Sequence, residues 1–230
     1  MQESNELEKF GAGSSSKHAL VVGATGATGK DLVNLLLNDP DFHRVDIFVR
    51  RRVDIQSSKL VVHVINFDEP QQWKDLVKGD VLFSCLGTTL KAAGSKDAQW
   101  KIDHDYQLEF AEAARENGVN SYVLVSSAGA SAKSPIFYSS MKGKLEEAVH
   151  ALGFPKLVIF NPPILDRKET DRTMEVAGIK AIRFLNKLGI LRSQKPLPTR
   201  VLAQAMINSI KQGGSKAAHV KGEEIWSLAG

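Results

Sequence analysis

The sequence predicts an α/β protein: a single Rossmann-fold domain, with one doubly wound parallel sheet, helices on both faces and a small C-terminal substrate lobe. Three observations lead to this prediction. Short apolar segments alternate with amphipathic segments from residue 18 onward. A glycine-rich loop directly follows the first apolar segment. The 230 residues, 43% hydrophobic and 24% charged, suffice for one substantial core and exclude a disordered, collagen-like or coiled-coil chain.

The expected strands are short apolar runs of the kind found in buried parallel strands. The first, His18–Val22, ends in glycines, and the others follow at intervals that leave room for a helix or a loop between them. They cover residues 18–22, 44–49, 60–65, 80–85, 121–125 and 157–160, with a further short strand at 225–228.

The expected helices have apolar residues at helical spacing. The first ends before Pro40, and the longest is capped by Gly118. They cover residues 30–38, 71–77, 98–117, 137–152, 175–188 and 201–211. Residues 1–17 are polar and lack the apolar region of a secretory signal, so we expect a flexible leader before one domain at 18–230, with its C-terminal lobe at about 162–230.

Composition and charge exclude several classes of function. The net charge of +4 is spread along the chain and only 7% of residues are aromatic, which argues against a nucleic-acid partner. No apolar run is long enough for a membrane span. Cys85 is the only cysteine, and the histidines show no metal-ligand spacing, so we expect no disulfide, no metal and a cytoplasmic protein, monomeric or homodimeric.

The glycine loop runs from Gly23 to Gly29 with the spacing GxxGxxG. Small residues between a strand and a helix let the backbone turn sharply and approach a pyrophosphate, which the helix N-terminus then binds. The pattern therefore predicts a dinucleotide site. The residues expected to wrap the phosphates are Gly23, Thr25, Gly26, Ala27, Thr28 and Gly29.

The end of the second strand indicates which nicotinamide cofactor is bound. An acidic residue there would hydrogen-bond the ribose hydroxyl of NAD, whereas arginine would accept the extra phosphate of NADP. Arg50 and Arg51 occupy this place, and the first carboxylate beyond them is Asp54. We therefore expect NADP(H). Asp68, after the third strand, is placed either to meet the adenine amino group or to cap the following helix.

A serine, a tyrosine and a lysine suggest carbonyl chemistry. Ser127 follows the fifth strand, and Tyr138 and Lys142 lie four residues apart in the next helix, which puts both side chains on one face. A neighbouring ammonium stabilises the phenolate form of tyrosine, so that the phenol can act as an acid or base. A serine hydroxyl facing it can hold a carbonyl oxygen. The alternative is a surface Tyr–Lys pair with no chemistry.

Together these motifs resemble the short-chain dehydrogenase/reductase superfamily, and more finely its atypical branch, the HIV Tat-interacting-protein-like oxidoreductases. The resembling stretches span roughly residues 18–170 in family order. They are Val22–Gly26, Cys85–Thr89, Asp103–Tyr106, Ser126–Ala130 and Tyr138–Glu146.

The resemblance implies roles for individual residues. Tyr138 would be the general acid/base, Lys142 would bind the nicotinamide ribose and favour the phenolate, and Ser127 would orient the carbonyl, with Ser126 as runner-up. The family's arginine pair matches Arg50 and Arg51. The remaining cofactor contacts implied are Leu86 and Gly87 under the ribose, with Thr88 and Thr89 beside it, and Pro163 and Ile164 at the nicotinamide.

Three departures from the family pattern stand out. Asp105 lies nearest to the position where many members carry a helix asparagine, and Asn161–Pro162 replaces Arg–Pro after the sixth strand. The separation of Ser127 and Tyr138 is compact for the extended members.

The segment from Asp166 to Arg172 either reaches a phosphate or an acidic substrate, or is a solvated charged face.

The function expected from these observations is NADP(H)-dependent hydride transfer to or from a small or medium carbonyl or alcohol. The first alternative is a non-catalytic NADP(H)-binding regulator or partner-binding protein, because a cofactor pocket does not by itself establish turnover. The second is a sugar-nucleotide epimerase or dehydratase, against which the short lobe after Asn161 argues.

Overall fold

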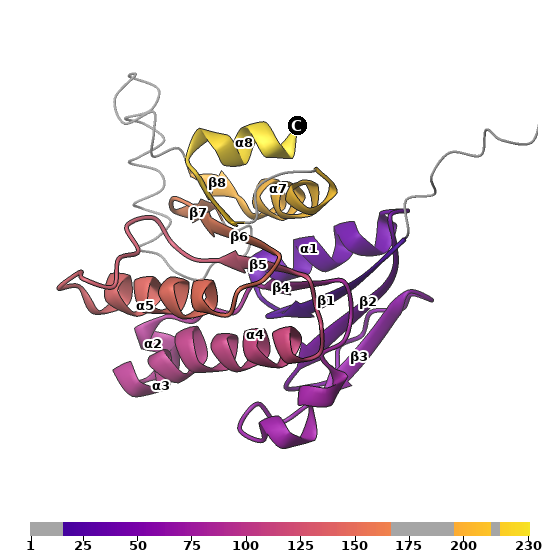
Figure 1. Cartoon of the computed structure of the whole chain (residues 1–230), viewed down its shortest axis with the longest axis horizontal. Coiled ribbons are helices and arrows are strands. Elements are labelled where there is room, and N and C mark those ends of the chain that lie inside the picture. Colours follow the sequence, from indigo (N-terminus) through magenta and orange to yellow (C-terminus); the bar gives the residue numbers. More distant parts are fainter. Residues whose placement is uncertain (1–15, 167–195, 213–216) are drawn as a thin grey trace, which may run out of the picture.

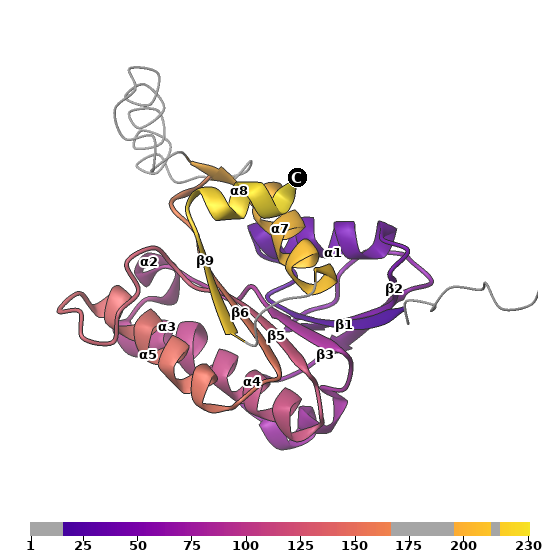
Figure 2. The same cartoon turned by 45° about the horizontal axis from the view of Figure 1, so that its top comes forward.

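The computed structural model describes residues 16–166, 196–212 and 217–230, and its centre is a seven-stranded parallel sheet (Figures 1 and 2). The strand order is β3-β2-β1-β4-β5-β6-β9. This is the doubly wound arrangement with a seventh strand at its edge, so the predicted fold class is confirmed. The strands are β1 Lys17–Val22, β2 Phe42–Val49, β3 Leu60–Val64, β4 Val81–Ser84, β5 Ser121–Val125, β6 Lys156–Asn161 and β9 Ala217–Lys221. A separate pair joins β7 Leu165–Asp166 to β8 Leu197–Pro198.

Helices cover both faces of the sheet, as the two views show (Figures 1 and 2). One face carries α1 Ala27–Asn38, α7 Thr199–Lys211 and α8 Glu223–Ala229. The other carries α4 Tyr106–Glu116 and α5 Phe137–Ala151. Smaller elements are α2 Leu90–Ala93, α3 Lys96–Trp100 and the 3-10 turns η1 Pro70–Gln72 and η2 Lys74–Leu76. Each face therefore has its own apolar core cluster, as expected of central strands buried on both sides.

Two C-terminal expectations differ from the structure. Ile225–Leu228, expected as a strand, lies in α8, where Ile225 is buried and the acidic Glu223 and Glu224 occupy the favourable first turn. The last strand of the main sheet is instead β9, which was not predicted. An isolated four-residue apolar run does not distinguish a strand from a helix.

The helix expected over residues 98–117 is interrupted. A π-helical turn, η3 Lys101–Asp105, joins α3 to α4. Such turns are rare inside helices and are often found beside functional sites, because they re-aim side chains. Here the turn carries Asp103 into the interior, where it is fully buried.

Candidate functional site

The segments predicted to form the site follow neighbouring strands. The carboxyl ends of β1, β4, β5 and β6 lie side by side along one end of the sheet, because these strands are parallel and adjacent. The sheet changes direction of winding at β1, which lies between β2 and β4, and ligands of such folds bind at this point. The predicted residues follow in strand order: Gly23–Gly29 after β1, Arg50–Arg51 after β2, Leu86–Thr88 after β4, Ser126–Ser127 after β5 and Pro163–Ile164 after β6.

The glycine loop has the close packing that the sequence pattern requires. Gly23 has φ +82°, and a Cβ there would lie 2.5 Å from the carbonyl carbon of Cys85 and the nitrogen of Leu86. A Cβ on Gly29 would lie 2.1 Å from the carbonyl oxygen of Gly23. Gly26 is the N-cap of α1, with no side chain capping the helix and no acidic residue in its first turn. The helix start is therefore suited to an anion.

Replacing Gly23 by alanine is expected to lower the free energy of unfolding by more than about 2 kcal/mol, because it combines left-handed backbone strain with a clash against the chain after β4. Gly118→Ala is the matched control, since Gly118 has φ +81° but a Cβ added there would meet no atom within 4 Å. Urea unfolding of the two variants measures the difference. An equal loss of stability in both would show that the close contact of Gly23 carries no cost.

The loop after β4 is fixed by Asp103. The backbone N–H of Thr88 donates to Asp103 Oδ2 at 2.9 Å, and a Cβ on Gly87 would come within 3.4 Å of Asp103 Oδ1. Asp103 therefore sets the path of the backbone at the place where the ribose is expected.

The same carboxylate pairs with Lys142. Their Nζ and Oδ1 atoms are 3.2 Å apart, and the side chains are 2% and 0% exposed, respectively. Breaking a buried pair of this kind is costly because it leaves an uncompensated charge. Asp105, which lies nearest in the sequence to the helix asparagine of the resembling superfamily, does not join this pair and accepts hydrogen bonds from Trp100 Nε1 and His104 Nδ1. The π-helical turn explains the difference, because Asp103 and not Asp105 faces the interior.

Two of the three expected catalytic residues, Ser127 and Tyr138, line one cavity of about 620 Å³, whereas Lys142 is buried against Asp103 and does not line it. Ser127 Oγ is buried there and has no hydrogen-bond partner among the described residues. Tyr138, one helical turn before Lys142 on α5, is 38% exposed at the same cavity. Ser126 also lines the cavity, but its hydroxyl donates to Glu146 Oε1. Of the two serines, Ser127 therefore keeps the hydroxyl that a ligand can use.

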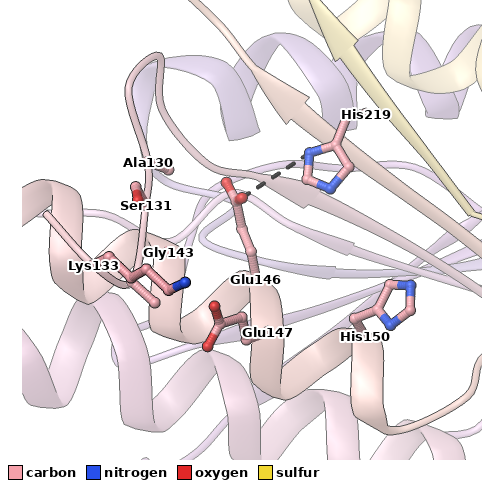
Figure 3. A pocket seen from close by; sticks show the side chains of 9 residues that line it. Ala130, Ser131, Lys133, Gly143, Glu146, Glu147, His150 and His219 are labelled. Atoms are coloured by element: carbon pink, nitrogen blue, oxygen red, sulfur yellow. Dashed lines mark ion pairs between the residues drawn. The ribbon is translucent and has the colours of Figure 1, made fainter.

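A second cavity, of about 510 Å³, is lined by Glu146 together with Glu147 and His219 (Figure 3). Glu146 Oε1 also accepts from Asn161 Nδ2 at 2.6 Å, and Glu146 Oε2 lies 4.0 Å from Nδ1 of His219 on β9. The Oδ1 atom of Asn161 is 3.0 Å from the same His219 nitrogen. Asn161, which stands where the resemblance implies an arginine, thus belongs to a network that holds Ser126 in place.

The residues predicted to contact the adenosine half of the cofactor lie beyond β2 and β3. Arg50, Arg51 and Asp54 are all exposed. Asp68 Oδ1 accepts a hydrogen bond from the Tyr106 hydroxyl and pairs with Lys101 Nζ, each at 2.5 Å. Asp68 does not cap a helix, because the residue at the N-cap of the following 3-10 turn is Glu69.

Burial raises the pKa of the Cys85 thiol to about 12, which disfavours a nucleophilic thiolate. In the described part of the chain no group of His, Cys, Asp and Glu side chains is arranged to hold a metal ion. The helices described here include none that is both long and apolar enough to cross a membrane. Arg167, Arg172 and the helix expected at 175–188 lie outside the described residues.

These features fit a nicotinamide dinucleotide. The loop from Gly23 to Gly29 has no room for a Cβ at Gly23 or Gly29. The start of α1 has no side-chain cap, and the hydroxyl of Ser127 has no partner among the described residues. Fold and site together define an NAD(P)-binding protein with a Rossmann fold.

Comparisons with known proteins agree with this class. The family model described as NAD(P)H-binding matches residues 23–153. The chain is 34% identical over 220 residues to "Protein fmp52-1, mitochondrial" of Aspergillus terreus, covering 91% of this chain and 94% of that protein. It is 37% identical over 166 residues to "Protein FMP52, mitochondrial" of Saccharomyces cerevisiae, covering 70% and 71%. The chain therefore belongs to the NAD(P)H-binding family and to the family of the FMP52 proteins.

Solved structures with the same fold are more distant. MoeE5 in complex with UDP-glucuronic acid and NAD superposes with a TM-score of 0.70 at 16% identity, over 89% of this chain and 76% of that one. A UDP-glucose 4-epimerase from Thermotoga maritima gives 0.68 at 11% identity, with the same coverage. At this identity the likeness shows the fold.

The comparisons also correct one expectation. A cytoplasmic location was expected from the single cysteine, but the FMP52 relatives are named as mitochondrial proteins, so this expectation is contradicted. One cysteine indicates a reducing environment at most, and does not distinguish compartments that share it. The finer resemblance to the Tat-interacting-protein-like group stays a prediction.

Proposed function

We propose that the protein is an NADP(H)-dependent oxidoreductase that reduces a small or medium carbonyl compound or oxidises the corresponding alcohol. The observation that carries this proposal is the buried hydroxyl of Ser127, without a partner among the described residues, in the cavity that Tyr138 lines, with Lys142 one turn further along α5. A buried hydroxyl without a partner is costly unless a ligand completes it.

Each of the three residues has a distinct task in this proposal. When bound, a nicotinamide cofactor would supply a hydride to a carbonyl carbon, or accept one from an alcohol carbon. Ser127 donates a hydrogen bond to the substrate oxygen and stabilises the negative charge that develops there. Tyr138 gives its hydroxyl proton to that oxygen during reduction and takes it back during oxidation. Lys142 supplies positive charge behind the phenol, and Asp103 holds the lysine in position.

The preference for NADP(H) rests on Arg50 and Arg51. Both side chains are exposed directly after β2, where the ribose phosphate of NADP is expected. Guanidinium groups bind phosphate through paired N–H donors, and the first carboxylate beyond them is Asp54. Asp68 is the proposed partner of the adenine amino group. Tyr106 and Lys101 both contact its Oδ1 atom, so Oδ2 is the oxygen proposed to accept the hydrogen bond from adenine.

Thermal melting with NADPH and with NADH tests this proposal. A cofactor at about 100 times its Kd stabilises the fold by about 2.7 kcal/mol, which corresponds to an increase of roughly 5–10 °C in Tm for a chain of this size. We expect the larger shift with NADPH. We also expect that preference to be lost when Arg50→Gln and Arg51→Gln are combined.

Lys78→Gln is the control for lost positive charge. Lys78 is exposed just before β4, at the amino-terminal ends of the strands and therefore away from the predicted cofactor site. It should keep the full NADPH shift. No shift with either cofactor would contradict the proposed function and leave the partner-binding alternative. An equal shift with both cofactors would overturn the NADP(H) preference only.

A further inference from the structure

We propose that the substrate is an amphipathic carbonyl compound, with an apolar body and an anionic group. This inference rests on the proposed function and names the chemistry of the substrate for the same cavity. Three features of the cavity carry it: an apolar mouth, one unpaired cation and the absence of carboxylates among the described residues that line it.

The mouth of the cavity concentrates exposed apolar surface. The described part of the chain has seven large hydrophobic side chains that are exposed, and four of them line this cavity: Leu90, Ile136, Tyr138 and Ile164. Ile136 is 64% exposed, the largest fraction among the seven. Single exposed apolar residues are ordinary, but a cluster around a concave site indicates a binding surface for an apolar ligand.

The charge in the cavity comes from Lys96. It is the only charged residue among the described residues that line the cavity. Its ammonium lies 5.4 Å from the ring centre of Phe137, beside Tyr138 on α5, and makes no ion pair within the described chain. An ammonium on an aromatic face keeps its donors available for an anion.

The second cavity shows the opposite character. It is lined by Glu146 and Glu147 together with Lys133 and two histidines, whereas the Ser127 cavity adds the neutral donors Thr88, Thr89 and Gln99 to Lys96. An anion is therefore electrostatically favoured in the cavity that contains Ser127 and Tyr138, and not in its neighbour.

The reaction balances for such a substrate. In the direction of reduction, an oxo acid, NADPH and one proton give a hydroxy acid and NADP⁺. The carbonyl π bond breaks, its carbon gains the hydride from the cofactor, and its oxygen gains the proton from Tyr138, which solvent then restores. The carboxylate is unchanged and acts only as the group that Lys96 recognises.

Two pairs of probes test the inference on the full chain. The binding pair is anilinonaphthalene sulfonate, an apolar anion, and Nile red, a neutral apolar dye. The turnover pair is phenylglyoxylate, an apolar oxo acid, and acetophenone, its neutral counterpart, each followed by NADPH oxidation. Pyruvate serves as an anionic carbonyl with almost no apolar body.

Lys96→Gln should weaken anilinonaphthalene sulfonate binding about threefold to fivefold, as expected for one partly exposed ion pair, and leave Nile red binding unchanged. The same variant should raise the KM for phenylglyoxylate by a similar factor. Lys91→Gln is the matched control, because Lys91 is exposed on α2 next to the cavity but does not line it. Ile136→Ser should weaken both dyes, and phenylglyoxylate should be a better substrate than pyruvate.

The outcomes separate this inference from the proposed function. If Lys96→Gln weakens the binding of both dyes equally, or of neither, while NADPH still raises the melting temperature, then the inference of an anionic group on the substrate is wrong. The oxidoreductase proposal then stands. If Lys96→Gln reduces the NADPH shift instead, then Lys96 binds a cofactor phosphate and the inference is overturned. If NADPH produces no shift in the unmodified protein, then the proposed function itself fails.

Discussion

Replacing Tyr138 by phenylalanine is expected to lower kcat by about 10²–10⁴-fold, the range measured for loss of a positioned general acid or base. The substitution removes one hydroxyl at the half-exposed end of α5, so the fold and the cofactor contacts should survive. The melting shift with NADPH should therefore remain. The measurement is NADPH oxidation with the carbonyl compound that the unmodified protein reduces fastest.

Tyr106→Phe is the control for the loss of a phenol. Tyr106 lies at the start of α4 and donates to Asp68. Burial and this hydrogen bond raise the pKa of Tyr106 to about 12, so it stays protonated at neutral pH and is unsuited to acid–base exchange there. An unchanged kcat in Tyr138→Phe would show that another group moves the proton. If the unmodified protein turns over no carbonyl compound at all, the non-catalytic regulator would be favoured over the enzyme.

Replacing Asp103 by alanine is expected to lower the free energy of unfolding by about 3–5 kcal/mol. The change leaves the ammonium of Lys142 buried without its carboxylate and removes the acceptor of the Thr88 backbone N–H. Urea unfolding measures the loss. A second variant, which combines Asp103→Ala with Lys142→Met, should regain part of the stability because no unpaired charge is left in the interior.

Asp105→Ala is the matched control, since Asp105 is two residues away and its side chain is 44% exposed. It should cost less than about 1 kcal/mol. If Asp103→Ala is no more destabilising than Asp105→Ala, then the buried pair does not contribute to the fold as the geometry indicates.

The glycine loop and the Tyr–Lys pair could be predicted because their chemistry depends on residues close together in the sequence. The spacing from Gly23 to Gly29 allows a strand-to-helix turn, and four residues place Tyr138 and Lys142 on one helix face. The strand order follows from the same logic, since the alternation of strands and helices leaves few right-handed arrangements.

The pairing of Asp103 with Lys142 could not be predicted in the same way. These residues are far apart in the sequence, and a π-helical turn decides which acidic side chain of the Asp103–Asp105 segment faces inward. Periodicity assumes regular helix geometry, and it therefore does not indicate that Asp103 is the buried residue and Asp105 the exposed one. The same holds for β9: its sequence, AAHVK, has mixed polarity, and it becomes a strand by pairing with β6.

The place of α7 and β9 in the sheet has a consequence for synthesis of the chain. A polypeptide leaves the ribosome from its N-terminus, and domains fold as units once their residues are available. The apolar surface beside α1 is covered by residues 199–211, and the edge of β6 is paired by residues 217–221. A nascent chain that has already formed the glycine loop and the Ser127 cavity still has one open face and one open edge. Completion of the fold therefore waits for residues 199–221, and until then this surface is a target for chaperones.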